Sequence, residues 1–306
     1  MRSAFANIAD KLPKKEIKHG KEVDSKGSGQ IDQARRRAYL HSKKLNPNDQ
    51  FQLDLIFPET IGDRNDLRHI PNDYARSSLF TAKNKREPRK TLTHEKLFHY
   101  NDYISILYTG IELRAEDDEI VWLQILSYGQ NVSLGEPFDF SVKDLIRDLA
   151  WSKNGRNYDR VRECISRLKA NEVLALNSKA YGKSGAISLI QNYTAVNDAE
   201  GKPTQYRLWI DPKLIVLFAG NNFTSHSWLV YLKLSPVARR LADYVESHKH
   251  PFPLTLAKFW QICGSSDANT TSWRQTVKRA CLEIQEAKIA KIAGLNSEDK
   301  IICVCE

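Results

Sequence analysis

The chain has 306 residues, 41% of them hydrophobic, which is enough for two domains with their own cores and a tail. Lysine and arginine outnumber aspartate and glutamate by 46 to 37, and the charge of +9 favours an acidic partner such as nucleic acid. The odd number of cysteines and the lack of a secretory signal argue against a disulfide scaffold and for a reducing cytoplasm. No apolar run reaches the roughly 18 residues of a membrane span.

Residues 1–50 hold twelve Lys and Arg against six Asp and Glu, which is +6 of the total charge. They are rich in Gly, Ser and Asn, so we expect a disordered basic tail. Its cluster Arg35–Arg37 either neutralises DNA phosphates without sequence preference or keeps the tail solvated. Residues 51–306 are nearly neutral, so the position of each basic residue there matters more than its number.

The apolar peptide Gln52–Phe57 follows the tail and is ended by Pro58. It resembles the motif with which bacterial proteins bind the replication sliding clamp, a Gln followed by Leu and then a terminal aromatic residue or Leu. In this interpretation Gln52 would hydrogen-bond to the clamp beside Leu53, while Leu55 and Phe57 would fill an apolar pocket. Alternatively, the peptide is an edge strand, or it packs against the first domain and holds the tail there.

The next segment is predicted to contain an arm, a strand and two helices. Lys83–Lys90 is a basic arm, and alternation of polar and apolar residues predicts a strand over Tyr100–Glu112. An acidic start and an apolar face predict a helix over 117–129. A short strand at Phe138–Phe140 precedes the second helix, in which Ser141 is the N-cap with an acidic residue three positions later.

A third helix is predicted over Asn157–Ala170, because apolar residues recur there at positions i, i+3, i+4 and i+7. Arg156, Arg160 and Arg167 share one stripe with Glu163, away from the apolar face. We interpret this stripe as DNA-binding, since arginines on a third helix suit phosphates or guanine edges. The alternative is a solvated face with one Glu163–Arg167 ion pair.

Val173–Asn177 and Ile187–Val196 are predicted to pair as a hairpin, and Gln205–Ile210 to add another strand. The hairpin tip, residues 179–185, is small, basic and glycine-containing, which suits a wing along the DNA backbone with Lys183 as its contact. The tip lacks the upstream glycine of a nucleotide-binding loop, so we expect no cofactor there.

The second half repeats this order after a short helix from Asp211 to Phe218, which we interpret as the joint. Ser235 caps the first helix, with Pro236 at its first position. The second helix is predicted over Leu254–Cys263.

The third helix of this half is predicted over about Thr270–Lys288. Arg and Gln side chains can pair with guanine and adenine edges in the major groove. The predicted outward stripe, which we interpret as DNA-binding, consists of Thr271, Arg274, Gln275 and Lys278. A last hairpin is predicted from Ile289–Ile292 and Ile301–Val304, with a short wing between them.

Two helices, a basic helix and a hairpin therefore occur twice, in residues 117–196 and 227–305. That order is typical of a winged helix, a helix-turn-helix variant whose third helix can enter the major groove. We predict an α+β protein with two tandem winged-helix domains, residues 72–211 and 212–306, behind a tail of residues 1–71.

Several long stretches resemble the TrfA family, the replication initiators of broad-host-range IncP-type plasmids. They are Asn72–Phe80, Asn84–Arg89, Thr109–Ala115, Val216–Gly220, Lys233–Arg240 and Cys263–Ser265. The resemblance implies binding to origin direct repeats (iterons), melting of an adjacent AT-rich segment, and recruitment of host DnaA, replicative helicase and sliding clamp. It also implies a monomer–dimer equilibrium. Ile56 makes the family's five-residue clamp motif a six-residue variant here.

Two other classes of function stay open. A transcriptional repressor could use the same fold but has no need of a clamp peptide. A nicking enzyme would need a metal and a tyrosine nucleophile. His248-Lys249-His250 places a charged residue where that motif has an apolar one, so we interpret it as a solvated helix end. We therefore expect no catalytic residue, metal site or cofactor.

Overall fold

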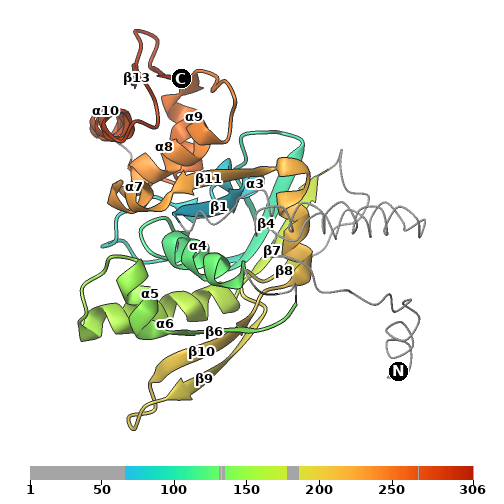
Figure 1. The fold of residues 1–306 in the computed structure, drawn as a ribbon. Helices are drawn as coiled ribbons and strands as arrows, with labels where there is room; N and C mark the ends of the chain where they lie inside the picture. Colours follow the sequence, from blue (N-terminus) through green and yellow to red (C-terminus); the bar gives the residue numbers. More distant parts are fainter. Residues whose placement is uncertain (1–65, 131, 133–134, 178–185, 268, 306) are drawn as a thin grey trace, which may run out of the picture. The chain divides into compact units, whose positions relative to one another are not determined.

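A computed structural model describes residues 66–130, 132, 135–177, 186–267 and 269–305 (Figure 1). By their contacts, the described residues belong to one compact unit. The tail, the clamp peptide Gln52–Phe57 and Lys183 lie outside the described residues, so the predictions made for them remain predictions. Within the described ranges, no helix is both long enough and apolar enough to cross a membrane.

The chain mixes helices and antiparallel strands, which confirms the α+β class. We call residues 118–209 the first helical unit. Its helices and the strands of its sheet are α4 (Asp118–Gly129), β6 (Phe138–Ser141), α5 (Val142–Asp148), α6 (Gly155–Lys169), β9 (Asn192–Asn197) and β10 (Pro203–Trp209). Ser141 caps α5 as predicted, since its hydroxyl oxygen accepts from Asp144 N at 3.0 Å. The strand order is β6-β10-β9, and β9 and β10 extend away from the helices as a hairpin (Figure 1).

The second helical unit, residues 236–304, repeats this arrangement. Its elements are α8 (Pro236–Glu246), β12 (Leu254–Thr255), α9 (Leu256–Ile262), α10 (Thr270–Glu286), β13 (Ile292–Leu295) and β14 (Lys300–Val304). The strand order β12-β14-β13 corresponds, strand by strand, to that of the first unit. The first strand of the last hairpin begins later than predicted, because Lys288 turns with a φ of 57° and Ile289 N still donates to Ile284 O.

The predicted hairpin of Val173–Asn177 with Ile187–Val196 is wrong. β7 (Glu172–Asn177) pairs along its length with β4 (Ile104–Ile111), and it pairs with only the two residues of β8 (Ala186–Ile187). The rest of the expected second strand belongs to β9, which pairs with β10. The turn that projects from the sheet of the first unit is therefore residues 198–202.

The physical reason is a break in alternation between β8 and β9. Leu189 and Ile190 are consecutive and both fully buried, which a regular strand with one buried face does not allow. Ile190 N donates to Leu168 O at 3.0 Å, and the Leu189 carbonyl accepts from Trp122 Nε1 at 3.1 Å. The chain therefore turns against the end of α6 and α4 before β9 begins.

The remaining elements lie before or between the two helical units in the chain. They are β1 (Leu67–Pro71), α3 (Asn72–Ala75), β2 (Phe80–Thr81), β3 (Thr91–Leu97), β5 (Leu113–Arg114), the 3₁₀ helix η2 (Pro212–Asn221), β11 (Phe223–Ser227) and α7 (Trp228–Lys233). β1 pairs antiparallel with β11, so the last residues of the expected tail are a strand held by the segment between the units. β2 pairs in parallel with β5.

A buried ionic cluster joins the two helical units. Arg240 on α8 is 0% exposed, and its Nη1 lies 2.8 Å from Glu119 Oε1 on α4 and 2.6 Å from Asp243 Oδ2. Its Nη2 donates to the carbonyl oxygens of Ala75 and Ser77, at 2.8 and 2.7 Å. One guanidinium thus holds α8 against α4 and against the end of α3 and the turn after it.

We expect the stability of the fold to decrease between pH 7 and 10, with His226 as a main cause. Burial alone would lower the pKa of this imidazole, but contacts with Asp243 at 2.8 Å and Glu246 at 2.6 Å raise it to about 10. A histidine whose folded pKa exceeds its unfolded value of 6.5 stabilises the fold fully below pH 6.5. That contribution is lost as the pH rises through 10.

Urea unfolding near pH 7 and near pH 9 should therefore show a loss of about 1–3 kcal/mol in the wild type. His226→Gln should lose less over the same interval. Part of the loss should persist in the variant, because burial also raises the pKa of Glu119 to about 8. An equal loss in both proteins would contradict the role given to His226.

Candidate nucleic-acid interface

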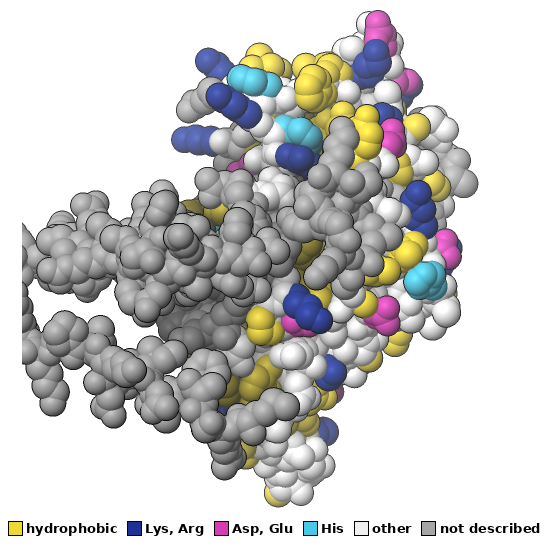
Figure 2. All heavy atoms as spheres, turned by 90° about the vertical axis from the view of Figure 1, so that its right-hand side faces the viewer, with side chains coloured by type: hydrophobic (Ala, Val, Ile, Leu, Met, Phe, Trp, Pro, Cys, Tyr) yellow, Lys and Arg dark blue, Asp and Glu magenta, His cyan; other side chains and the backbone are white. Residues whose placement is uncertain are grey.

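On the face seen in Figure 2, lysine and arginine side chains stand singly or in small groups among acidic, polar and apolar ones. A nucleic-acid interface here must therefore be identified from the geometry of particular residues rather than from one broad basic surface.

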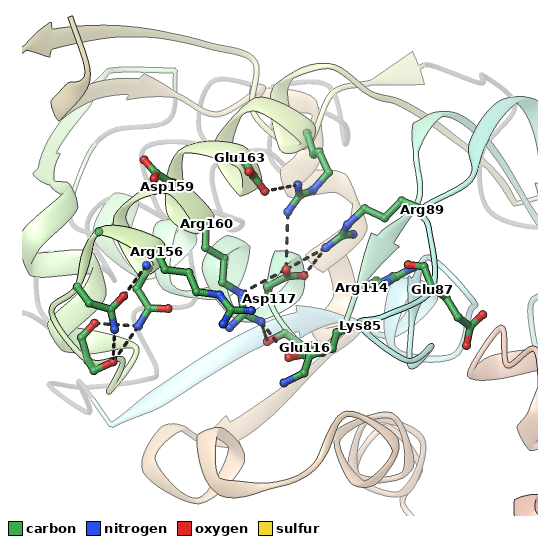
Figure 3. Close-up of a pocket in the computed structure, with 15 residues that line it drawn as sticks. Lys85, Glu87, Arg89, Arg114, Glu116, Asp117, Arg156, Asp159, Arg160 and Glu163 are labelled. Atoms are coloured by element: carbon green, nitrogen blue, oxygen red, sulfur yellow. Dashed lines mark hydrogen bonds and ion pairs between the residues drawn. The ribbon is translucent and has the colours of Figure 1, made fainter. Parts of the chain in front are cut away.

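An open polar groove of about 970 Å³ runs along the N-terminal half of α6 (Figure 3). Residues of α6, of the preceding turn, of the arm Lys83–Lys90 and of the start of α4 line it. Its cationic side chains are those of Lys85, Arg89, Arg114, Arg156, Arg160 and Arg167. The groove therefore brings together residues that are up to about eighty positions apart in the sequence.

α6 is positioned as its sequence predicts. Asn154 caps it, since the amide oxygen accepts from Asn157 N at 2.9 Å. Val161, Cys164, Ile165 and Leu168 are all buried, which confirms the predicted apolar face. The first turn of α6 is therefore fixed at the groove, and the positive end of the helix dipole there favours anions.

The predicted arginine stripe separates into residues with different environments. Arg156 is exposed at the first turn of α6. Arg160 is half-buried, with its guanidinium 4.3 Å from the centre of the Trp151 ring and 3.3 Å from Glu116 Oε1. Both side chains face the groove, and Arg160 is already oriented by a ring and a carboxylate.

Arg167 does not project outward, so the prediction of one continuous outward stripe is wrong. Its side chain is 10% exposed, and its Nε lies 2.9 Å from Asp118 Oδ1. The expected pairing with Glu163 is present but longer, at 3.5 Å. The reason is that α6 crosses the acidic start of α4 at this point, so the buried carboxylates attract the third arginine inward.

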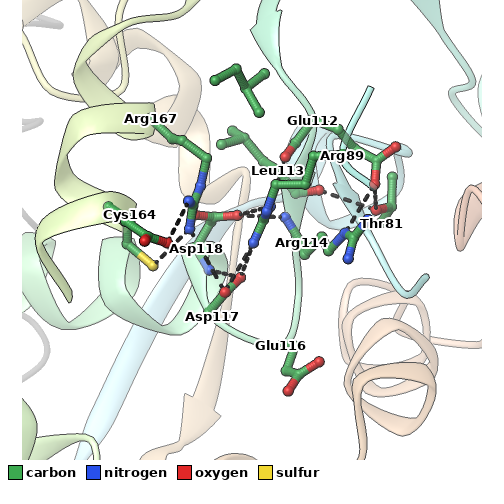
Figure 4. A network of polar contacts seen from close by, with 12 residues as sticks. Thr81, Arg89, Glu112, Leu113, Arg114, Glu116, Asp117, Asp118, Cys164 and Arg167 are labelled. Atoms are coloured by element: carbon green, nitrogen blue, oxygen red, sulfur yellow. Dashed lines mark hydrogen bonds and ion pairs between the residues drawn. The ribbon is translucent and has the colours of Figure 1, made fainter. Parts of the chain in front are cut away.

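Two adjacent carboxylates at the start of α4 anchor this end of the groove (Figure 4). Arg89 binds both, with Nη2 at 2.8 Å from Asp117 Oδ1 and Nη1 at 2.6 Å from Asp118 Oδ2. Burial raises the pKa of Asp118 to about 6, and the neighbouring Asp117 adds to this effect. Burial opposes ionisation of Asp117 too, but Arg89 and two further arginines lower its pKa below the usual value.

Asp117, Asp118 and Cys164 bring three potential metal ligands within 4.8 Å of one another. Arginine occupies this cluster instead, since Arg167 Nη2 donates to Cys164 Sγ at 3.3 Å and Arg89 binds both carboxylates. Burial also raises the pKa of the Cys164 thiol well above its ordinary value, so the thiolate that a metal needs is disfavoured. The cluster serves to hold α6 and the arm against α4.

The outward stripe of α10 is exposed as predicted. Thr271, Gln275 and Lys278 are exposed, and Arg274 is half-exposed. Arg274 pairs with Asp299 in the turn between β13 and β14, so the helix and the hairpin tip adjoin. Trp273, Val277, Ala280, Cys281 and Ile284 are buried on the opposite face. α10 therefore presents a polar surface with donors and acceptors suited to base edges.

The sequence indicated the basic arm but gave it no role. The structure places Lys85 on the wall of the groove opposite α6 (Figure 3). The signal was present in the charge density, with five Lys or Arg in the eight residues of Lys83–Lys90. The sequence alone does not reveal that this segment lies close to α6.

Because the α6 arginines lie in different environments, we expect their removal to lower the free energy of unfolding by different amounts. Arg167→Ala should lower the free energy of unfolding by about 1–3 kcal/mol, because charge-assisted hydrogen bonds to buried Asp118 are lost. Arg156→Ala is the matched control on the same helix and should leave the urea midpoint unchanged, since its side chain is exposed. Equal midpoints for the two variants would contradict the buried placement of Arg167.

Comparison with known proteins identifies the family. A family model described as TrfA protein matches residues 19–305 of this chain. The Escherichia coli protein named plasmid replication initiator protein TrfA is 39% identical over 277 residues, which cover 90% of this chain and 70% of that protein. A crystal structure of domains 2 and 3 of RctB, as selenomethionine derivatives, matches with a TM-score of 0.51 at 13% identity, over 76% of this chain and 96% of that one, which shows a shared fold. The family model and the 39% identity show that this chain belongs to the TrfA family.

Proposed function

We propose that this protein is a plasmid replication initiator that binds origin direct repeats (iterons) through two tandem winged helices. The observation that carries the proposal is the repeated order of helix, strand, helix, helix and two strands, with matching sheet orders β6-β10-β9 and β12-β14-β13. Membership of the TrfA family supports the replication role, because a relative is named a plasmid replication initiator.

In this proposal α6 and α10 are the two helices that enter successive major-groove segments. On α10, Arg274 and Gln275 would bind base edges, and Thr271 and Lys278 would contact bases or phosphates. On α6, Arg156 and Arg160 would contact bases or phosphates from the groove, while Arg167 positions the helix through Asp118. The turns at residues 198–202 and 296–299 would be the wings, and a contact from Lys183 stays a further prediction.

Two helices joined in one compact unit would read a longer site than either alone. Once one helix is bound, binding of the second is intramolecular and therefore favoured. We infer that fitting both helices bends or untwists the repeat, at a cost of a few kcal/mol. Over several repeats this strain would help to melt the adjacent AT-rich DNA. Host DnaA, the replicative helicase and the sliding clamp, the last bound through Gln52–Phe57, would then act on the opened origin.

The test is a mobility shift on direct repeats from the plasmid's own origin, with a scrambled duplex of equal length as control. Selective binding that weakens steeply with salt is the expected result. Equal binding to both duplexes would leave only a nonspecific DNA-binding protein.

The alternative is a repressor with the same fold. Clamp capture by the wild type, lost in the Leu55→Ala, Phe57→Ala variant, would favour the initiator over the repressor.

A further inference from the structure

The arm Lys83–Lys90 bridges the two helical units. At one end Lys85 lines the groove of α6. At the other end Ser266 Oγ, in the turn between α9 and α10, donates to Glu87 Oε2 at 2.5 Å. Just before the arm, Ala82 N donates to Cys263 O at 2.7 Å. The arm therefore contacts the turn that precedes α10, and it lines the same groove as the first turn of α6.

The arm is held in one conformation by a buried arginine. Arg114 is 3% exposed, and its Nη1 and Nη2 donate to the carbonyl oxygens of Asn84 and Glu87 at 3.0 and 2.9 Å. Within the arm, Glu87 N donates to Asn84 O, and Arg86 N donates to Asn84 Oδ1, both at 3.0 Å. A segment fixed in this way loses little conformational entropy when it binds a ligand.

The cations of the arm divide into two groups. Lys83 lies 2.5 Å from Glu112, and Arg89 binds the carboxylates of Asp117 and Asp118, so these two are used inside the protein. Lys85 and Arg86 at the tip and Lys90 at the far end are exposed, and none of the three forms an ion pair with any residue that the structure describes. The rigid turn therefore presents two uncompensated positive charges between the two helical units.

We propose that the tip of the arm binds DNA phosphates on the stretch between the parts read by α6 and α10. This inference rests on the proposed function, because it needs a duplex that spans both helices. Such a duplex would pass close to the arm, because the arm contacts both units. Between the two major-groove segments that α6 and α10 occupy, the duplex would present its minor groove and the flanking phosphates. Lys85 and Arg86 would add affinity and set the register of the two units without reading bases.

The variant Lys85→Gln, Arg86→Gln tests the proposal on the origin repeat over about 50–200 mM salt. Loss of two phosphate contacts should make the slope of log K against log salt less steep by about 1.8. The preference for repeat over scrambled duplex should stay unchanged. Lys96→Gln, Lys249→Gln is the charge-matched control, since both lysines are exposed and lie outside the groove, and its slope should remain that of the wild type.

Neutral methylphosphonates place the contact along the DNA. Substitution at the centre of the repeat should weaken wild-type binding but not binding of the arm variant. An unchanged salt slope in the arm variant, or equal sensitivity of both proteins to the central substitution, would overturn the role of the arm while leaving repeat recognition intact. If the wild type bound the repeat and the scrambled duplex equally well, the proposed function itself would fail.

Discussion

Arg240→Ala is expected to lower the free energy of unfolding by about 3–5 kcal/mol, the largest effect of any single substitution considered. The guanidinium is 0% exposed and lies between Glu119 and Asp243, which are themselves fully buried. Its removal leaves two carboxylates and the carbonyl oxygens of Ala75 and Ser77 without their shared donor. A buried Asp243 carboxylate, and buried acceptors that lose their donor, cost more than the intact interactions contributed.

Urea or thermal unfolding of the purified chain measures this effect. Arg207→Ala is the matched control, because Arg207 also forms a bidentate contact with an aspartate, Asp139, but both side chains are more than half exposed. We expect its midpoint to stay close to that of the wild type, since exposed ion pairs contribute little. Similar midpoints for the two variants would mean that Arg240 does not hold the helical units together.

Arg274→Ala combined with Gln275→Ala is expected to reduce the preference for the origin repeat by about 2–6 kcal/mol, which is roughly 30-fold or more. Gln275 is exposed on α10, and Arg274 is half-exposed beside it, paired with Asp299. On binding, Arg274 would exchange that carboxylate for a base edge, and each side chain could then form paired hydrogen bonds with a base. Binding to a scrambled duplex should fall much less, because it depends on phosphate contacts.

The ratio of affinities for the repeat and the scrambled duplex is the quantity to measure. Arg279→Ala is the control, because Arg279 is exposed on the same helix but lies to one side of the stripe. Loss of its charge should weaken binding to both duplexes equally and leave the ratio unchanged. If the double variant kept the wild-type ratio, α10 would not be the helix that reads sequence.

The sequence by itself determined the local elements and the family. Ser141 and Ser235 cap helices at the predicted residues, since a side-chain acceptor beside a free backbone N–H acts within one turn. The apolar faces of α6 and α10 followed from a period of 3.6 residues, which needs no knowledge of the partner. The stretches that resemble the TrfA family were equally local, and the family model confirmed them.

Only the tertiary structure decided the environment of each charge and the pairing of each strand. Arg156 and Arg167 share a helical stripe, yet one is exposed and the other is bound to Asp118, because α6 crosses α4 at one end only. Arg240 resembles a surface residue in the sequence but lies in the core beside Glu119, 121 positions away. A helical period gives the direction of a side chain, whereas ion pairing and strand pairing depend on distances that arise only when remote segments pack.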